Sequence, residues 1–340
     1  MKKAIILFNL GGPDSLSAVE PFLFNLFNDP AIISLPSFLR YPLAKLISKR
    51  RTPIAKAIYA EMGGRSPILE ETQKQASAIE KSLQNEKDEY KCFIVMRCWN
   101  PRASETITKV KEFKPHQIIL LPLYPQYSNA TSGSSINEWL DICKKKNFVV
   151  ETKIICCYPT EKDFILSYSN LVKEKIDMKK LNEITLIFSA HGLPENKIKK
   201  GDPYQWQVEQ SVKELVKKIS IKNLNYILTY QSRVGPLKWI GPSTEQIIKK
   251  EAQKQKIIIV VPVAFVSEHS ETLVELDIEY KKLAIESGSK DYIRVPAVTV
   301  NKDFINSLKS SILQASTGEK FTSSIKCFEK FKKCPRLSNL

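Results

Sequence analysis

Residues 256–280 read KIIIVVPVAFVSEHSETLVELDIEY. The first ten residues are almost continuously apolar, which is typical of a strand buried on both faces of a parallel sheet. A short polar stretch at 267–270 follows, and the apolar residues after it recur at helical spacing. The segment therefore predicts a buried strand that leads through a polar loop into an amphipathic helix.

The same unit of strand, loop and helix recurs along the chain. Seven further apolar runs lie near 3–8, 91–97, 117–124, 149–157, 183–189, 225–231 and 291–296, with helical patterns between them. This alternation predicts a Rossmann-like α/β protein with two similar domains, each a four-stranded parallel sheet flanked by helices. We expect domains at 1–172 and 173–300, a helix at 301–316 that packs back on the first domain, and a polar tail at 317–340.

Composition excludes several classes of protein. The 340 residues carry a net charge of +16, but the lysines are scattered and form no basic stripe with interleaved aromatic residues, which argues against a nucleic-acid site. Neither of the common nucleotide-binding glycine motifs occurs. An odd number of cysteines, seven, indicates a reducing compartment. The start of the chain lacks a signal-peptide cleavage site and no run is long enough to span a bilayer, so we expect a cytoplasmic protein, with contact at the inner face of a membrane left open.

One segment, 17–50, is unusually apolar. Phe22, Leu23, Phe24 and Phe27 surround the first helix predicted there, and further apolar residues continue to a basic triplet at 49–51. Two interpretations remain. The segment is either a buried helical hairpin or an exposed lip that receives an apolar ligand or a membrane surface.

Polar residues gather where the predicted strands end, and in open parallel sheets ligands bind beyond the carboxyl ends of the strands. His191 follows the fifth strand and Glu271 follows the seventh. An imidazole with a carboxylate can hold a divalent metal ion and accept protons. The alternative for His191 is a hydrogen-bonded polar residue in a turn. His116, at the start of a strand, is expected to be structural.

Glu275 and Glu279 continue from Glu271 at intervals of one helical turn. Like charges at this spacing destabilise a helix slightly, so helix stability alone does not explain the row. It is either solvated surface or a carboxylate path that carries protons or metal ions to the site.

Motifs over nearly the whole chain resemble those of the ferrochelatase family. They are LFNLGGP, KRRTP, GGRSP, PLYPQYSNATSGSS, FSAHGLP, KGDPY, YQSRVGPLKWIGP and VPVAFVSEHSETLVELDIEY. The resemblance implies two similar domains around a porphyrin cleft. It also implies the terminal step of haem biosynthesis, in which this lyase inserts Fe²⁺ into protoporphyrin IX without ATP and releases two protons.

The resemblance also implies roles for particular residues. His191 and Glu271 become the catalytic and metal-binding pair, with His269, Glu275 and Glu279 on the proton or metal path. The implied porphyrin-binding residues are Leu10, Arg51, Tyr59, Ser66, Arg97, Ser232 and Trp239.

No resident cofactor is required for this chemistry, although some ferrochelatases carry a [2Fe–2S] cluster through C-terminal cysteines. The candidate ligands here are Cys156, Cys157, Cys327 and Cys334. Because adjacent cysteines rarely both reach one cluster, the alternative is that these thiols are unrelated. Two alternatives to the function remain: a chelatase for another tetrapyrrole or metal, such as coproporphyrin III or cobalt, and a non-enzymatic two-domain ligand-binding protein.

Overall fold

The computed structural model describes residues 1–233, 235 and 237–337, which form two compact units. Unit 1 comprises Met1–Cys157 and Leu308–Ser323. Unit 2 comprises Tyr158–Ser307 and the described residues from Ser324 onward. Each unit is built on a parallel sheet.

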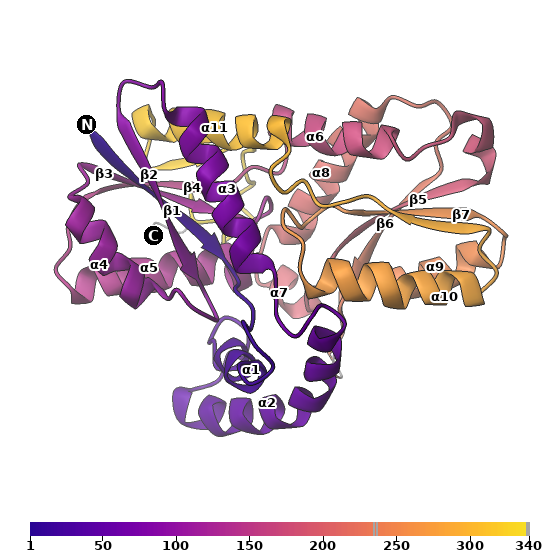
Figure 1. The fold of residues 1–340 in the computed structure, drawn as a ribbon, viewed down its shortest axis with the longest axis horizontal. Helices are drawn as coiled ribbons and strands as arrows, with labels where there is room; N and C mark the ends of the chain where they lie inside the picture. Colours follow the sequence, from indigo (N-terminus) through magenta and orange to yellow (C-terminus); the bar gives the residue numbers. More distant parts are fainter. Residues whose placement is uncertain (234, 236, 338–340) are drawn as a thin grey trace. The chain divides into compact units, whose positions relative to one another are not determined.

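The sheet of unit 1 has the strand order β2-β1-β3-β4-β9, and every neighbouring pair is parallel. Its strands are β1 (Lys2–Asn9), β2 (Glu89–Met96), β3 (Gln117–Pro122), β4 (Glu151–Cys157) and β9 (Phe321–Ser323). Residues 4–8 of β1 and 118–121 of β3 are buried because helices cover both faces of the sheet. Helix α3 (Ile68–Leu83) lies on one face, and α4 (Ala103–Phe113) and α5 (Ser134–Lys145) lie on the other (Figure 1).

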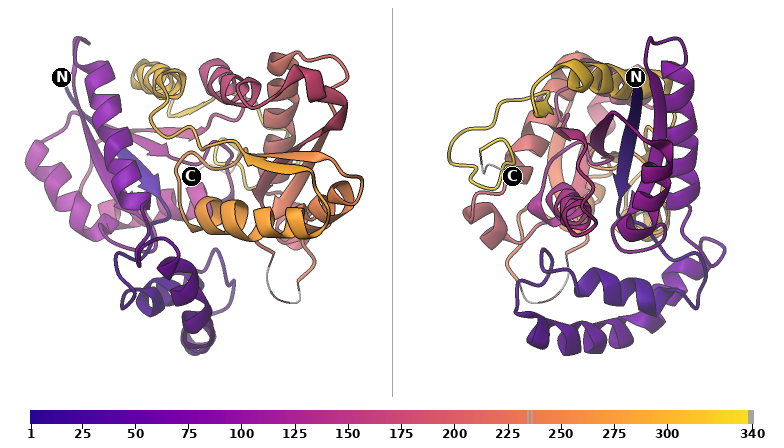
Figure 2. Two further views of the ribbon diagram at one scale, coloured as in Figure 1. Left: turned by 45° about the vertical axis from the view of Figure 1, so that its right-hand side comes forward. Right: turned by 90° about the vertical axis from the view of Figure 1, so that its left-hand side faces the viewer.

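Two helices of unit 1, α1 (Val19–Phe27) and α2 (Ser37–Ala60), lie beyond the carboxyl end of β1 (Figures 1 and 2). They combine the two interpretations of the apolar segment. Phe22 and Leu23 of α1 are buried, whereas α2 presents Phe38 (74% exposed) and Ile54 (67% exposed) to solvent. Helix α1 thus contributes to a buried apolar cluster, and α2 carries exposed apolar side chains.

Unit 2 repeats this connectivity with the strand order β6-β5-β7-β8, again entirely parallel. The strands are β5 (Ile184–His191), β6 (Tyr226–Gln231), β7 (Ile257–Pro262) and β8 (Asp291–Arg294). Helices α6 (Lys162–Lys173) and α8 (Tyr204–Ile219) cover one face, and α9 (Thr244–Ala252) and α10 (Tyr280–Glu286) cover the other (Figure 1). Short elements complete the unit: η2 (Met178–Glu183), α7 (Glu195–Lys199) and the π-helix η3 (Glu271–Glu279).

The α/β class and all eight predicted strands are confirmed, but the sheet of unit 1 has five strands instead of four. The additional strand, β9, lies in the region predicted as a polar tail. It is only three residues long, too short for a periodic pattern, and forms only by pairing with the edge of β4.

The predicted boundary at 172 is wrong, because the units divide between Cys157 and Tyr158. Helix α6 belongs to unit 2, where the Tyr168 hydroxyl donates to the carbonyl oxygens of Pro262, at 2.9 Å, and Phe265. The predicted C-terminal helix is α11 (Lys302–Thr317). Its residues from 308 onward belong to unit 1, where Lys309 donates to the Ser82 carbonyl oxygen at the end of α3.

Candidate active site

The central residues of the site lie at the carboxyl edge of the unit 2 sheet. His191 ends β5 and is paired in register with Gln231, which ends β6. The π-helix η3 follows β7 and begins at Glu271. Parallel strands deliver their following loops to one edge, so residues 40 and 80 positions from His191 meet there.

His191 and Glu271 face each other, with 3.6 Å between His191 Nε2 and Glu271 Oε1. His191 Nδ1 lies 2.6 Å from the Gly192 carbonyl oxygen, which accepts a hydrogen bond and therefore favours the proton on Nδ1 in the neutral ring. The Tyr204 hydroxyl donates to the His191 carbonyl at 3.0 Å. His191 Nε2 is thus directed at the carboxylate, with a lone pair available for a proton or a metal ion.

The surroundings of His191 change its affinity for a proton. Burial of the imidazole lowers its pKa, but the negative charge of Glu271, the Gly192 carbonyl and the charge of Glu275 together outweigh burial. The net effect is a pKa above the ordinary value for histidine. Since 41% of the side chain is still exposed, solvent and small ligands can reach the ring.

Glu275 is held firmly on the next turn of η3. Ser232 donates to it twice, from its backbone N–H at 2.9 Å and from its hydroxyl at 2.6 Å. The Gln231 amide and the Tyr280 hydroxyl donate at 3.0 Å and 2.9 Å. Burial and repulsion by Glu271 nevertheless raise the pKa of Glu275 above its ordinary value, so this carboxyl takes up a proton more readily than an exposed one.

Glu271 keeps one oxygen unpartnered. Among the described residues, no hydrogen-bond donor reaches Glu271 Oε2, although the atom is buried. The nearest cationic candidate, His269 Nε2, is 3.9 Å away. A buried carboxylate oxygen without a donor is costly unless it binds a proton or a metal ion at some stage.

The acidic row runs from the interior to the surface. Glu271 and Glu275 are partly buried, and Glu279, one turn further along η3, is exposed. Exposure therefore increases along the row from Glu271 to Glu279.

Trp239 and Gly192 are packed together beside the pair. Trp239 forms an isolated bridge with Pro194, and a Cβ atom added to Gly192 would lie 3.1 Å from the Trp239 ring and 2.8 Å from the Gln231 carbonyl oxygen. Only glycine fits at position 192 without moving the backbone that ends β6.

The structure places the remaining predicted porphyrin-binding residues in unit 1. Leu10 and the buried Tyr59 pack in the apolar cluster around Phe22. Ser66 lies so close to Gly12 that an added Cβ would come within 2.5 Å of it. Arg51 is exposed, with its guanidinium 5.8 Å from the centre of the Phe27 ring.

Arg97 is extensively engaged by protein groups. Its three guanidinium nitrogens contact Ser134 Oγ at 2.7 Å, Glu138 Oε1 at 3.1 Å and Asp29 Oδ2 at 2.9 Å. Arg102 shares Glu138 Oε1 at 2.6 Å. This network ties the chain that follows α1 to the sheet and to α5.

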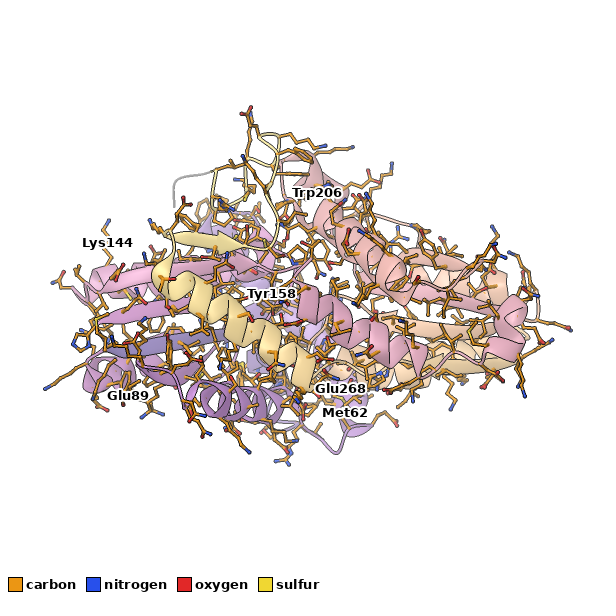
Figure 3. All side chains as sticks on the ribbon, turned by 90° about the horizontal axis from the view of Figure 1, so that it is seen from above. Met62, Glu89, Lys144, Tyr158, Trp206 and Glu268 are labelled. Atoms are coloured by element: carbon orange, nitrogen blue, oxygen red, sulfur yellow. The ribbon has the colours of Figure 1, made fainter. Side chains whose placement is uncertain are left out.

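The four candidate cluster ligands do not gather into a metal site in the part of the chain that the structure describes. No group of three or more His, Cys, Asp or Glu side chains there could hold a metal ion. Cys156 and Cys157 end β4 with their sulfur atoms 3.7 Å apart. Cys327 and Cys334 lie in the C-terminal segment of unit 2, in an apolar cluster against Trp206. Figure 3 labels Trp206, which lies beside this segment.

His116 lies at the amino edge of the unit 1 sheet, just before β3. Its Nδ1 accepts a hydrogen bond from the Lys2 backbone N–H at 3.1 Å, as expected of a structural residue.

Sequence reasoning missed Gln231 and Tyr280 as partners of Glu275. Gln231 stands next to Ser232 in YQSR and could have been found as the residue that ends its strand. No local pattern marks Tyr280, which meets Glu275 only through the geometry of η3.

The fold alone places the protein in a structural class. It is similar to sirohydrochlorin chelatase SirB from Bacillus subtilis subspecies spizizenii in complex with cobalt, with a TM-score of 0.53 and 9% identity over 93% of this chain and 95% of that one. It is also similar to SirB from Bacillus subtilis with Fe³⁺, with a TM-score of 0.52 and 10% identity over 93% and 96%. The two-unit α/β fold is therefore that of the chelatases.

The sequence comparisons then identify the family. The family model described as Ferrochelatase matches residues 2–316. The ferrochelatase of Pelagibacter ubique (strain HTCC1062) is 61% identical over 99% of both chains, and that of Rickettsia bellii (strain OSU 85-389) is 49% identical over 97% of this chain and 94% of that one. The chain belongs to the ferrochelatase family.

Proposed function

We propose that the protein is a porphyrin metal chelatase that inserts Fe²⁺ into protoporphyrin IX to give protohaem, without ATP. The observation that carries this proposal is the His191–Glu271 pair, 3.6 Å apart, with the carboxyl group of Glu275 beside it, in a member of the ferrochelatase family. Metallation requires a group that accepts the two protons of the inner N–H groups and a group that directs the metal ion, and this cluster contains both.

His191 is the proposed proton acceptor. Its Nδ1–H is held by the Gly192 carbonyl, so Nε2 takes the proton from a pyrrole N–H. Glu271, whose Oε2 has no donor among the described residues, is the proposed metal ligand or second proton acceptor. Each proton taken up at the site can pass to Glu275 and then to the exposed Glu279. His269, 3.9 Å from Glu271, belongs to the same proposed path.

Seven residues are proposed to contact the porphyrin. The exposed Arg51, together with Tyr59 and Ser66, would bind the anionic propionates, since guanidinium and hydroxyl groups are strong carboxylate donors. Leu10, Ser232 and Trp239 would contact the macrocycle. The three guanidinium nitrogens of Arg97 already bind Asp29, Glu138 and Ser134. We therefore propose that the porphyrin contacts Arg97 only at the outer side of this hydrogen-bond network.

A direct assay tests the function. Purified protein, anaerobic Fe²⁺ and protoporphyrin IX are followed by the visible spectrum, with coproporphyrin III and with Co²⁺ in parallel. We expect metallation of protoporphyrin IX with Fe²⁺ and without ATP. Porphyrin binding without metallation would instead support the alternative of a non-enzymatic ligand-binding protein. Faster metallation of coproporphyrin III, or faster insertion of Co²⁺, would indicate a chelatase for another tetrapyrrole or another metal ion.

We also propose a cytoplasmic protein that contacts the inner face of a membrane through α2. No helix in the described residues has the length and apolar character needed to cross a bilayer. Helix α2 instead carries exposed apolar side chains interspersed with exposed basic ones, and basic side chains attract an anionic lipid surface that the apolar ones can then contact. The apolar ones are Phe38, Leu39, Tyr41, Leu46 and Ile54, and the basic ones are Lys45, Lys49, Arg50, Arg51 and Lys56.

A further inference from the structure

Arg294, the last residue of β8, is joined to η3 and to the loop before it. Its Nε and Nη2 donate to the two carboxylate oxygens of Asp277, at 2.7 and 2.6 Å. Its Nη1 donates to Glu268 Oε1 at 2.7 Å. The guanidinium is only 11% exposed, so these charge-assisted bonds form largely out of water and are individually strong.

A second side chain of β8 supports the same helix. The Tyr292 hydroxyl donates to the Leu276 carbonyl oxygen at 2.7 Å. Glu268 accepts a further bond from the backbone N–H of Ala297 at 2.9 Å. One end of β8 and the chain after it therefore fix both the entry to η3 and its middle.

The π-helical form of η3 needs such support. π-Helical turns are rare and persist mainly where tertiary contacts or function require them. Relaxation to an α-helix would shift the hydrogen-bond register by one residue and rotate Glu271 and Glu275 relative to His191 and Ser232.

Electrostatic repulsion works against η3 as well. Residues 268–279 contain the carboxylates of Glu268, Glu271, Glu275, Asp277 and Glu279. Within the described residues, every ion pair between this segment and a lysine or arginine involves Arg294. Its positive charge is thus the principal one that compensates the acidic segment.

We propose that Arg294 is a positioning residue: by bridging Asp277 and Glu268 it holds η3 in the register in which Glu271 faces His191 and Glu275 faces Ser232. This inference rests on the proposed function of Glu271. Arg294 itself contacts neither substrate nor metal ion.

The test combines Arg294→Lys with Glu271→Gln in the full chain. Lysine keeps the charge but cannot bridge two carboxylates with fixed geometry. We expect kcat for Fe²⁺ insertion to fall roughly ten-fold or more in Arg294→Lys, with the Kd for protoporphyrin IX unchanged within about two-fold. In the Glu271→Gln background the same change should cost clearly less than in the wild-type background, because one of the two residues that Arg294 positions no longer acts. An equal loss in both backgrounds, or no loss in either, would overturn the proposal.

Amide hydrogen exchange provides a readout that does not depend on activity. Peptides covering Glu271–Glu279 should exchange faster in Arg294→Lys, whereas peptides covering β5 should not change. Unchanged exchange in η3 would also overturn the proposal. If Glu271→Gln proves fully active, the catalytic assignment of Glu271 fails, but the exchange experiment still tests whether Arg294 holds η3 in its register.

Two further variants guard against a folding artefact. Asp277→Asn removes one partner with little change of volume and should reproduce both effects. Lys282→Gln breaks an exposed ion pair with Glu286 on the following helix, 3.9 Å long, and should leave kcat and exchange in η3 unchanged. A wild-type result for Asp277→Asn, or the same losses in Lys282→Gln, would contradict the assignment to Arg294.

Discussion

At the scale of single residues, the site depends on one imidazole whose two nitrogens have different partners. His191 Nδ1 is held by the Gly192 carbonyl, and Nε2 faces Glu271. The same ring can therefore bind a proton or a metal ion only at one defined position. This asymmetry comes from the backbone turn that ends β5, so it is as much a property of Gly192 as of the histidine.

We predict that His191→Ala lowers turnover by at least about 10²-fold, the usual loss when a general base is removed. Porphyrin binding should survive, because the proposed propionate contacts at Arg51, Tyr59 and Ser66 remain. Glu271→Gln should also suppress turnover, since it keeps the shape but removes the charge. Steady-state metallation and fluorescence titration with porphyrin measure the two properties. His116→Ala is the matched control and should be nearly fully active; a fully active His191→Ala enzyme would refute the central assignment.

Gly192→Ala should also impair the site without touching a titratable group. The new methyl group would lie 2.8 Å from the Gln231 carbonyl oxygen, which is backbone and cannot move away cheaply. Displacement of β6 would carry Gln231 and Ser232 away from Glu275. We expect kcat to fall with little change in secondary structure, measured by metallation kinetics and far-UV circular dichroism. An unchanged kcat would show that the turn accommodates the methyl group.

A residue outside the site makes stability depend on pH. Asp88 binds the buried Lys3 of β1 at 2.7 Å, and hydrogen bonds, first of all from Lys3, lower the pKa of Asp88 to about 2. Because the folded pKa lies below the unfolded one, this stabilisation is complete above about pH 4 and is lost as the pH falls towards 2.

Asp88→Asn should therefore remove this part of the acid sensitivity. It should also lower stability at neutral pH by about 1–3 kcal/mol, because Lys3 is left buried without its counter-charge. Urea unfolding at pH 7, 4 and 3 measures both effects. Parallel pH profiles for the variant and the wild type would contradict the assignment.

At the scale of secondary-structure elements, α1 and α2 share one apolar sequence but have different surroundings. Phe22 of α1 is 5% exposed, whereas Phe38 of α2 is 74% exposed. Phe22→Ser should lower the free energy of unfolding by about 3 kcal/mol or more, as loss of a buried aromatic side chain does. Phe38→Ser should leave it within about 0.5 kcal/mol, because exposed side chains contribute little to stability.

Substitutions of the exposed apolar side chains of α2 also test the proposed membrane contact. Phe38→Ser, alone or with Ile54→Ser, should weaken binding to anionic vesicles in a sedimentation assay while the melting temperature stays constant. If vesicle binding does not change in these variants, α2 does not form the proposed membrane contact.

At the scale of the whole molecule, the two units share one strand connectivity but carry different chemistry. The carboxyl edge of unit 2 gathers His191, Glu271 and Glu275, whereas unit 1 gathers the Arg97–Asp29–Glu138 network after the corresponding strands. A π-helix follows the third strand of the shared order in each unit, η1 (Asn129–Gly133) after β3 and η3 after β7. The architecture is repeated, and function differs through the side chains placed on it.

The whole molecule should carry no iron–sulfur cluster. Protein purified without air is expected to be colourless and to lack stoichiometric iron and acid-labile sulfide, since no group of three or more suitable ligands occurs in the described residues. Cys327→Ser and Cys334→Ser should keep full activity. A coloured sample with about two iron atoms and two sulfides per chain would reverse this prediction.

The sequence by itself determined the eight strands other than β9, the α/β class and the strand ends near which His191 and Glu271 lie. A strand that is buried on both faces requires a continuous apolar run, which is visible in the sequence. Ligand sites of open parallel sheets lie beyond the carboxyl ends of the strands, so the strand ends indicate where the proposed site lies. Only the tertiary structure decided the place of β9, the division after Cys157, the outward face of α2 and the π-helical register held by Arg294. These features arise from contacts between residues distant in the sequence, such as Arg97 with Asp29 or Arg294 with Asp277, and such pairings leave no local pattern.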